Sequence, residues 1–456
     1  MRALLVSTYD LGRQPFGLAS PAAWLRRAGV EVDCADTSRQ PLDDGRIRAA
    51  SVIAFYLPMH TATRMAATLI ERVRRVNPTA RLCAYGLYAP LNAGWLRDRG
   101  VHDVLGPEAE QDLVALANSQ LSTPNSQYPI PNSEGIARLT FIQPDRQDLP
   151  APERYASLQM PDGSVRVMGS TDATRGCKHL CRHCPIVPVY RGQFRVVPVD
   201  VVIDDIRAQV ATGAQHISFG DPDFLNGPAH ARRIVETFAR ECPDVTYDAT
   251  IKIEHLLDHA EMLSVLHDTG CLFITSAVES IDDEVLVKLR KGHTRADFAW
   301  AVALCRQAGI RLTPTFIPFT PWTSVEAYAE LLDALDELDL VEDVAPIQLA
   351  IRLLVTAESP LLELPDIAAV VQPFDPTSLT WPWRHPDPRV DDLHAGVMRI
   401  VRETDNAPRA GVFDAISALV RESLGLATVP RVHRGATAGP RVTEPWYCCA
   451  EPMEPF

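Results

Sequence analysis

Along residues 1–118, a strand-like and a helix-like pattern of apolar and polar positions alternate. Short apolar runs predict buried strands, and the stretches between them, such as PAAWLRRAG and TATRMAATLIERVRRV, repeat their apolar residues at helical spacing. The expected strands are RALLVST (2–8), VEVDCA (30–35), SVIAFYL (51–57), ARLCAYG (80–86) and HDVLG (102–106). This alternation predicts a doubly wound parallel sheet with helices on both faces, and a ligand at the carboxyl ends of its strands.

The chain then changes character over residues 119–160. The stretch SQLSTPNSQYPIPNSEG is rich in Ser, Asn, Gln and Pro and has no hydrophobic period. Such a composition is typical of a connecting segment, so we expect a linker here.

A second alternating series covers residues 161–370. The expected strands are 165–171, 216–220, 245–251, 271–278, 310–318 and 345–351, and the main helical patterns are 258–269, 282–290, 296–308 and 325–337. Six such units predict a partial (β/α)6 barrel, in which the residues that follow each strand build the active site.

Residues 371–456 predict a small helical extension. A proline-rich stretch, TWPWRHPDPR, precedes two helical patterns at 390–404 and 411–425, and the chain closes with WYCCAEPMEPF. No apolar run approaches the roughly 18 residues that a membrane span needs, and the short apolar start is a poor secretion signal. We therefore expect a cytoplasmic protein with no membrane partner.

The charge balance argues against a nucleic-acid partner. Lys and Arg number 44 and Asp and Glu number 58, so the net charge is −14 and the isoelectric point is near 5.4. A surface this acidic repels phosphate backbones unless a local basic patch overrides the total.

Three of the ten cysteines form the sharpest chemical signal, Cys177-Lys-His-Leu-Cys181-Arg-His-Cys184. Three thiolates at this spacing can hold three corners of an iron–sulfur cube, and one iron then lacks a protein ligand. An open coordination position can chelate a substrate or cofactor. A structural zinc site is the alternative, with His179 or His183 as the fourth ligand.

A CxxxCxxC motif after the first strand of a barrel resembles the signature of the radical S-adenosylmethionine (SAM) superfamily. The resemblance implies a [4Fe–4S] cluster on Cys177, Cys181 and Cys184, whose open iron chelates the methionyl part of SAM. Reductive cleavage of the sulfonium then typically yields a 5′-deoxyadenosyl radical, with chemistry that the cofactors supply. The chain departs from the family at His183, where an aromatic Phe or Tyr usually packs near the adenine.

Further stretches extend the resemblance and imply additional cofactor-binding residues. FGDPDF (219–224) follows the second strand, where Asp221 or Asp223 would accept a hydrogen bond from the methionine amino group; an ordinary acidic turn is the alternative. AVES (277–280) follows the fourth strand, and Glu279 and Ser280 would face the ribose or the methionine. Lys252, with Glu254 two residues later, would meet the methionine carboxylate or else lie at a solvated strand end.

Residues 1–118 resemble the cobalamin-binding-like domain that precedes the radical core in one large branch of the superfamily. PAAWLRRAGVEV (21–32), AYGLYA (84–89), DVLGPEAEQDL (103–113) and the bridge PDRQDLP (144–150) carry this resemblance. The DxHxxG motif, whose His ligates cobalt, is missing, because Asp10 is followed by Leu-Gly-Arg. Two interpretations stay open: cobalamin bound without that His, or a domain that only braces the barrel.

The tail Cys448-Cys449-Ala-Glu-Pro resembles that of a group of radical SAM proteins with a CCAEP or a selenocysteine CUAEP ending. Adjacent thiols can hold a soft ion or form a labile disulfide. Cys448 and Cys449 are therefore candidate catalytic residues, as hydrogen-atom donor, substrate ligand or carrier of reducing equivalents. The alternative is an exposed tail with incidental cysteines.

Together these features predict a radical SAM enzyme that acts on an unknown substrate and receives electrons from a donor such as flavodoxin or ferredoxin. In one version of this hypothesis the enzyme also uses cobalamin for methyl transfer. The non-catalytic alternative is an iron–sulfur redox or metalloid-binding protein whose C-terminal cysteine pair is the functional end.

Overall fold

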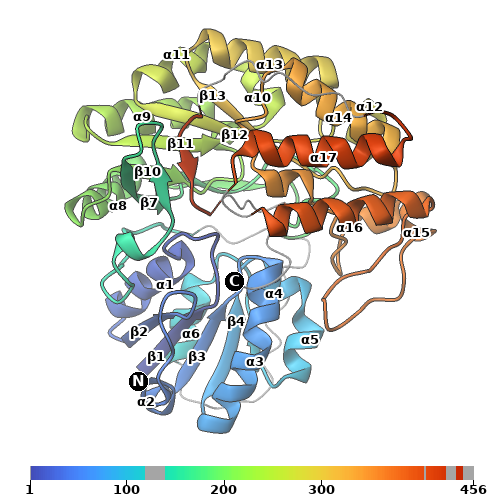
Figure 1. Cartoon of the computed structure of the whole chain (residues 1–456). Coiled ribbons are helices and arrows are strands. Elements are labelled where there is room, and N and C mark those ends of the chain that lie inside the picture. Colours follow the sequence, from blue (N-terminus) through green and yellow to red (C-terminus); the bar gives the residue numbers. More distant parts are fainter. Residues whose placement is uncertain (1, 119–138, 405–406, 428–437, 445–456) are drawn as a thin grey trace.

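The computed structural model describes residues 2–118, 139–404, 407–427 and 438–444 (Figure 1). Its N-terminal part is a five-stranded parallel sheet in the order β2-β1-β3-β4-β5. The strands are β1 (Arg2–Ser7), β2 (Glu31–Asp36), β3 (Val52–Tyr56), β4 (Arg81–Tyr85) and β5 (Asp103–Val104). All five lie where the apolar runs predict them, and the strand order reverses between β1 and β3.

Helices cover both faces of this sheet, as a doubly wound fold requires. One core joins the sheet to α1 (Phe16–Arg27) and α6 (Glu110–Asn118). A second core on the opposite face joins it to α2 (Asp44–Ala49), α3 (His60–Val76), α4 (Tyr88–Leu91) and α5 (Ala93–Asp98). The carboxyl ends of the strands point toward the rest of the chain (Figure 1).

The second part is a curled sheet in the order β13-β12-β11-β10-β7-β6-β14. Its five parallel strands are β7 (Val165–Thr171), β10 (His216–Phe219), β11 (Thr246–Thr250), β12 (Cys271–Glu279) and β13 (Arg311–Phe316). The helices between and after them are α8 (Val199–Ala211), α9 (Pro228–Glu241), α10 (Ile253–Asp258), α11 (Glu261–Asp268), α12 (Asp283–Leu289), α13 (Arg295–Gln307) and α14 (Val325–Glu337). This is the expected partial barrel.

The expected sixth strand is absent from the described part of the barrel. Residues 345–351 form instead a 3-10 turn, η3 (Pro346–Leu349), and the sixth position is a single bridge between Phe319 and Arg352. A short apolar run cannot by itself distinguish a strand from a buried turn, and Pro346, which lacks an amide hydrogen, starts the turn instead of joining a ladder.

Several short elements complete the barrel edge and its first loop. A 3-10 turn, η1 (Pro152–Arg154), and β6 (Ser157–Gln159), both within the stretch predicted as linker, precede β7, to which β6 pairs antiparallel. β14 (Arg441–Val442) returns from the far end of the chain and pairs with β6. A ribbon of β8 (Thr174–Gly176) and β9 (Phe194–Val196) flanks α7 (Ile186–Tyr190).

The chain after the barrel strands forms η4 (Pro360–Glu363) and α15 (Pro365–Ala368), and the C-terminal extension contains α16 (Pro388–Glu403) and α17 (Arg409–Ser423). Its proline-rich part packs rather than standing free: Trp383 is buried and donates its indole hydrogen to the Leu353 carbonyl at 2.8 Å. The loop before it reaches the N-terminal sheet domain, where Trp95 donates to the Pro376 carbonyl at 2.9 Å. The extension therefore spans both larger units (Figure 1).

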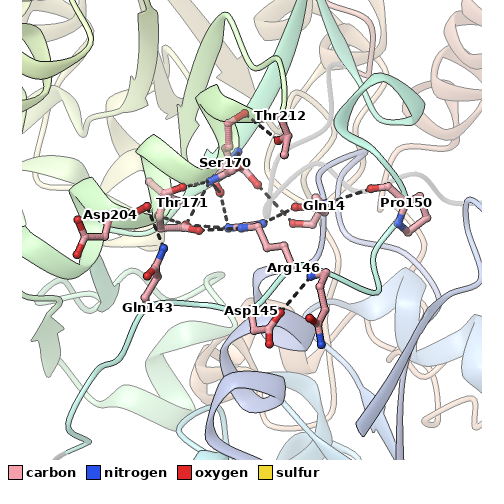
Figure 2. Close-up of polar contacts among 12 residues, drawn as sticks. Gln14, Gln143, Asp145, Arg146, Pro150, Ser170, Thr171, Asp204 and Thr212 are labelled. Atoms are coloured by element: carbon pink, nitrogen blue, oxygen red, sulfur yellow. Dashed lines mark hydrogen bonds and ion pairs between the residues drawn. The ribbon is translucent and has the colours of Figure 1, made fainter. Parts of the chain in front are cut away.

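Arg146, within the expected bridge, joins the two sheets. Its guanidinium contacts both oxygens of Asp205 on α8 at 2.8 and 2.9 Å, the Ser170 carbonyl on β7 at 2.8 Å and Gln14 of the N-terminal domain at 2.8 Å. Gln14 in turn donates to the Pro150 carbonyl at 3.0 Å (Figure 2). This network fixes how the carboxyl ends of both sheets face each other.

Among the helices of the described residues, none is both long enough and apolar enough to cross a membrane.

Candidate functional site

The three cysteines of the motif lie on the loop between β8 and α7, next to the carboxyl ends of the barrel strands. Gly176, immediately before them, has φ +78°, and a Cβ there would lie 2.3 Å from the Tyr190 ring, so only glycine fits this turn. The loop closes on itself through the Cys184 amide, which donates to the Cys181 carbonyl at 3.1 Å. The predicted ligand loop is thus gathered at the barrel mouth.

The environment of the cysteine thiols suits a bound cation. Burial raises the pKa of Cys177 to about 12, and the charges of Asp223, Cys184 and Cys181 add to the rise. Burial likewise raises the pKa of Cys181, whereas the nearby charge of Lys291 lowers it. Without a cation, these buried thiols would therefore stay protonated. A metal cluster binds the thiolate form and stabilises it with its own positive charge.

Asn226 holds the start of the cysteine loop. It follows the second barrel strand, in η2 (Phe224–Asn226), and accepts hydrogen bonds from the Cys177 thiol at 3.7 Å and the Lys178 amide at 3.2 Å. Its amide group donates to the Gly176 carbonyl at 3.4 Å. Sequence reasoning missed Asn226, because a lone asparagine 49 residues away carries no spacing signal.

The two acidic candidates after the second strand have different partners. Asp221 accepts from the Ala173 amide at 2.9 Å and the Thr174 hydroxyl at 2.6 Å, and burial, followed by the charge of Asp172, raises its pKa to about 7. Asp223 faces His255 at 2.6 Å and His179 at 3.3 Å. Burial alone would raise the pKa of Asp223, but these two histidines hold it well below its ordinary value.

Lys252 joins the group around Asp223. Its buried ammonium lies 2.5 Å from Glu254 Oε2 and 3.2 Å from His179 Nδ1. His179, Asp223 and His255 bring one ligand atom each within 4.8 Å of one another. The sequence analysis assigns His179 only as an alternative zinc ligand beside the cysteines and assigns His255 no role, so it is the fold that brings these side chains together.

Glu279 is buried at the end of β12 with φ +70°. One carboxylate oxygen faces His183 Nε2 at 3.0 Å and the Lys291 ammonium at 3.3 Å. Although burial raises its pKa, the charge of Lys291 and the hydrogen bond to His183 lower it to about 2. Its residue neighbour Ser280 accepts from the Asp282 amide at 3.0 Å and so shapes the turn before α12.

Two buried atoms of this pair have no hydrogen-bond partner among the described residues: Glu279 Oε2 and His183 Nδ1. A buried carboxylate oxygen left without a donor costs free energy of order 1–3 kcal/mol or more. A ligand with hydroxyl or amino donors would satisfy it, so the site fits the ribose or ammonium of SAM. His183, which departs from the aromatic residue of the family, is held as a hydrogen-bonding partner of Glu279.

A cavity of about 1680 Å³ opens beside the cysteine loop, between the two sheets. Tyr9, Thr37 and His60, which follow β1, β2 and β3, line one wall, and His183 and Pro185 of the cysteine loop line another. The cavity thus lies at the strand-order reversal, as expected for this fold. It exceeds the roughly 300–1,000 Å³ of most small-molecule pockets, so it has room for a large cofactor.

The position of the missing cobalt-ligating histidine is filled by the chain itself. In Asp10-Leu-Gly12, a Cβ on Gly12 would lie 2.6 Å from the Glu444 carboxyl carbon, and Gly12 has φ +71°. Glu444 is fixed there by Arg39 and by the Tyr9 hydroxyl at 3.1 Å. A side chain at residue 12 would have to displace Glu444 from these contacts and to adopt a strained left-handed backbone. The candidate residues Cys448 and Cys449 lie outside the described residues.

The comparisons with known proteins agree with this geometry. The model of the radical SAM superfamily matches residues 172–335. Among curated proteins, a tRNA-2-methylthio-N(6)-dimethylallyladenosine synthase of Fusobacterium nucleatum is 28% identical over 197 residues, which are 39% of this chain and 41% of the relative. A bacteriochlorophyllide d C-12(1)-methyltransferase of Chlorobaculum tepidum is 29% identical over 126 residues, 27% of each protein. The chain spans less than half the length of both relatives.

Two solved structures share nearly the whole architecture. The radical SAM methyltransferase TsrM from Kitasatospora setae, with cobalamin and a [4Fe–4S] cluster bound, has a TM-score of 0.65 at 16% identity over 95% of this chain and 92% of its own. The cobalamin-dependent radical enzyme OxsB, with aqua-cobalamin and SAM bound, has a TM-score of 0.65 at 12% identity over 92% and 71%. At such identities the likeness shows the fold. Residues 172–335 are a radical SAM domain, for which a [4Fe–4S] cluster and SAM are the implied cofactors, within a chain that shares the fold of TsrM and OxsB.

Proposed function

We propose that this protein is a radical SAM enzyme that holds a [4Fe–4S] cluster on Cys177, Cys181 and Cys184 and cleaves SAM reductively at the open iron. The observation that carries the proposal is the placement of three buried or half-buried cysteines, none of them in a disulfide, beside Glu279, whose buried carboxylate oxygen Oε2 has no donor among the described residues. The cluster, when bound, supplies the electron that breaks a carbon–sulfur bond of SAM.

The polar residues around the cysteine loop divide into SAM contacts and loop supports. Asp223, kept ionised by its histidines, suits the methionine ammonium, and the buried ammonium of Lys252 suits its carboxylate. Glu279 suits the ribose hydroxyls or the ammonium. Asp221 and Ser280 hold the loops, because their oxygens already accept hydrogen bonds from the chain.

The cavity at the strand-order reversal supports cobalamin as a second cofactor. Its volume and its position between the N-terminal sheet and the cysteine loop fit a large planar molecule that must lie near the SAM methyl group. Gly12 offers no imidazole to cobalt, and His60 Nε2 is bonded to the Ser378 carbonyl at 2.6 Å. Neither position would therefore supply an imidazole, and cobalamin would be held by the cavity wall that Tyr9, Thr37 and His60 form.

The described chain before the C-terminal cysteines ends at the cavity. Glu444 lines the cavity and is fixed by Arg39 and Tyr9. Cys448 is only four residues further on in the sequence. This closeness in sequence supports our proposal that Cys448 and Cys449 act at the reacting centre.

An electron donor such as flavodoxin or ferredoxin fits the surface outside the cysteine loop. Leu180 and Val287 are exposed, and the basic residues Lys178 and Arg290 lie in the same loop and at the end of α12. The loop and the helix touch, because the Arg182 amide donates to the Leu289 carbonyl at 2.9 Å. An apolar spot with basic neighbours suits an acidic redox protein.

Anaerobic reconstitution with iron and sulfide, followed by dithionite and SAM, tests the proposal. Release of 5′-deoxyadenosine or methylthioadenosine is the expected result. A reduced cluster that leaves SAM intact would favour the non-catalytic alternative, an iron–sulfur redox or metalloid-binding protein. Addition of hydroxocobalamin tests the second cofactor separately, because a bound corrin keeps its visible absorbance through gel filtration.

A further inference from the structure

Both ends of the cysteine loop are hydrogen-bonded to one carboxylate of the N-terminal domain. Arg175, on β8, precedes Cys177 by two residues, and its guanidinium donates to Glu108 Oε2 at 3.2 Å. Tyr190 ends α7, which follows Cys184, and its hydroxyl donates to Glu108 Oε1 at 2.8 Å. The two oxygens of Glu108 thus contact the chain on either side of the three cysteines.

A second carboxylate beside Glu108 strengthens this contact. Glu108 lies in the turn between β5 and α6, and Glu110, the first residue of α6, accepts from Arg175 at 2.7 Å. Ser20 on α1 donates to Glu110 at 2.7 Å and accepts from Arg175 at 3.1 Å. The side chains of Arg175, Glu108 and Glu110 are only 10%, 3% and 2% exposed. Buried charges at these distances are weakly screened by solvent, so the contact is strong and directional.

The two flanks of the loop also touch each other. Gly176, which separates Arg175 from the first cysteine, lies so close to the Tyr190 ring that a Cβ on it would come within 2.3 Å. The Arg175 guanidinium lies over the rings of Phe16 and Phe141, 5.1 and 5.0 Å from their centroids. A shift of Arg175 or Tyr190 would therefore move the cysteine loop with it. Asn226 holds the same loop from the barrel side, so the loop is fixed from both domains.

We propose that Glu108 is a positioning residue through which the N-terminal domain fixes the place of the three cluster ligands. This role rests on the proposed function, because it concerns the same site. Glu108 acts through Arg175 and Tyr190, as an outer-shell partner acts through a metal ligand. Replacement of such partners typically lowers metal affinity or activity by roughly 10–100-fold.

Two conservative variants release the loop in different ways. Glu108→Gln keeps the size of the side chain and removes its charge, whereas Tyr190→Phe removes only the hydroxyl that donates to Glu108. The matched control is Asp103→Asn, which neutralises an equally buried carboxylate of the same domain. Asp103 pairs at 2.7 Å with Arg81, which lies at the amino end of β4.

The first test is alkylation of the cluster-free full chain by iodoacetamide, with each cysteine followed by mass spectrometry. We expect Glu108→Gln to raise the alkylation rate of the three loop cysteines at least about tenfold and Tyr190→Phe at least about threefold, because the loop opens locally. The buried cysteines Cys271 and Cys305 report unfolding of the whole barrel in the same molecule and should react as slowly as in the wild type. Asp103→Asn should stay within about twofold of the wild type at every one of these cysteines.

The second test uses the protein reconstituted with iron and sulfide. Glu108→Gln should change the shape of the electron paramagnetic resonance signal of the reduced cluster and raise the KM for SAM about tenfold. Asp103→Asn should match the wild type in both measurements. A role in stability alone would lower the unfolding free energy of Glu108→Gln and leave the signal and the KM unchanged.

Unchanged alkylation of the loop cysteines in Glu108→Gln would overturn the inference, and Tyr190→Phe decides it in the same way if Glu108→Gln does not fold. A rise that Cys271 and Cys305 share, or that Asp103→Asn reproduces, would also overturn it, since the loop would then open only with the whole domain. A wild type that forms the cluster without cleaving SAM would count against the proposed function alone, because alkylation of the cluster-free chain does not depend on SAM.

Discussion

The boundary between the two sheets has two sides that are built in opposite ways. At the junction, the Arg146 guanidinium finds four acceptors on Asp205, Ser170 and Gln14, and the linker is tied to both domains (Figure 2). Around the cysteine loop and the cavity, buried atoms such as Glu279 Oε2 have no donor among the described residues. At the junction the polar groups of Arg146 and its partners are hydrogen-bonded within the chain, whereas on the cavity side some buried polar atoms are left to bind a ligand.

This difference separates stability from function along one interface. A saturated polar network needs no cofactor to form, so the two sheets are held in place by the chain alone. Polar groups that cost free energy when buried without partners persist where a ligand satisfies them. Substitutions on the two sides should therefore affect different measurements.

The largest effect is expected at the cysteine loop. Cys181→Ala removes one of three cluster ligands and should abolish the visible iron–sulfur absorbance and SAM cleavage while leaving the fold intact. Iron content and absorbance after anaerobic reconstitution measure this. The matched control is Cys242→Ala, a buried cysteine at the end of α9, which should keep the cluster. A Cys181→Ala protein with full iron content would refute the ligand assignment.

The junction should respond in stability rather than in cluster content. Arg146→Gln removes the ionic partner of the Asp205 carboxylate, which is 1% exposed and keeps only the neutral donors Thr171 and Gln209. Breaking such a buried pair costs about 3–5 kcal/mol of unfolding free energy, measured by urea unfolding of the cluster-free protein. Arg232→Gln, which breaks only an exposed pair with Glu236, should cost under about 0.5 kcal/mol. An equal loss of unfolding free energy in both variants would show that the junction does not stabilise the fold as described.

Glu279 should couple the stability of the cavity side to pH. Its pKa is lowered from 4.5 in the unfolded chain to about 2 in the folded one, so the stabilisation is present above pH 4.5 and is lost as the pH falls toward 2. The full contribution is about 3 kcal/mol. Unfolding free energies measured from pH 5 to pH 3 should fall less steeply in Glu279→Gln than in the wild type. Parallel slopes would show that the carboxylate is not ionised as described.

A smaller effect is expected from the C-terminal tail. Deletion of residues 447–456 should leave iron content unchanged and lower turnover of SAM several-fold, because it removes the candidate catalytic residues Cys448 and Cys449. Cys448→Ser/Cys449→Ser should reproduce the loss if the thiols, rather than the chain, are responsible. Unchanged turnover in both proteins would make the tail incidental.

Much of the fold follows from the local pattern of apolar residues. Where a strand has a clear apolar run and flanking helices, its predicted bounds lie within a few residues of the observed ones. The exception, 345–351, shows the limit: the run APIQLAI is buried, but Pro346 starts a turn and only Arg352 bridges to Phe319. An apolar run predicts that the segment is buried, but it does not determine whether the backbone forms a strand or a turn.

The candidate site divides in the same way. The sequence is enough to predict the three cluster ligands, because Cys177, Cys181 and Cys184 lie within eight residues at a characteristic spacing. Asn226 and His255 were not, because their partners lie 49 and 76 residues away and only the barrel brings them together. Lys291 likewise meets Glu279 only after α12 has folded back.

The central claim is that three cysteines leave one iron open to SAM, and electron paramagnetic resonance of the reduced cluster tests it most directly. The account predicts a [4Fe–4S] signal that changes shape when SAM is added and that is absent from Cys181→Ala. A signal indifferent to SAM, or anaerobically purified protein that contains zinc in place of iron, would contradict it.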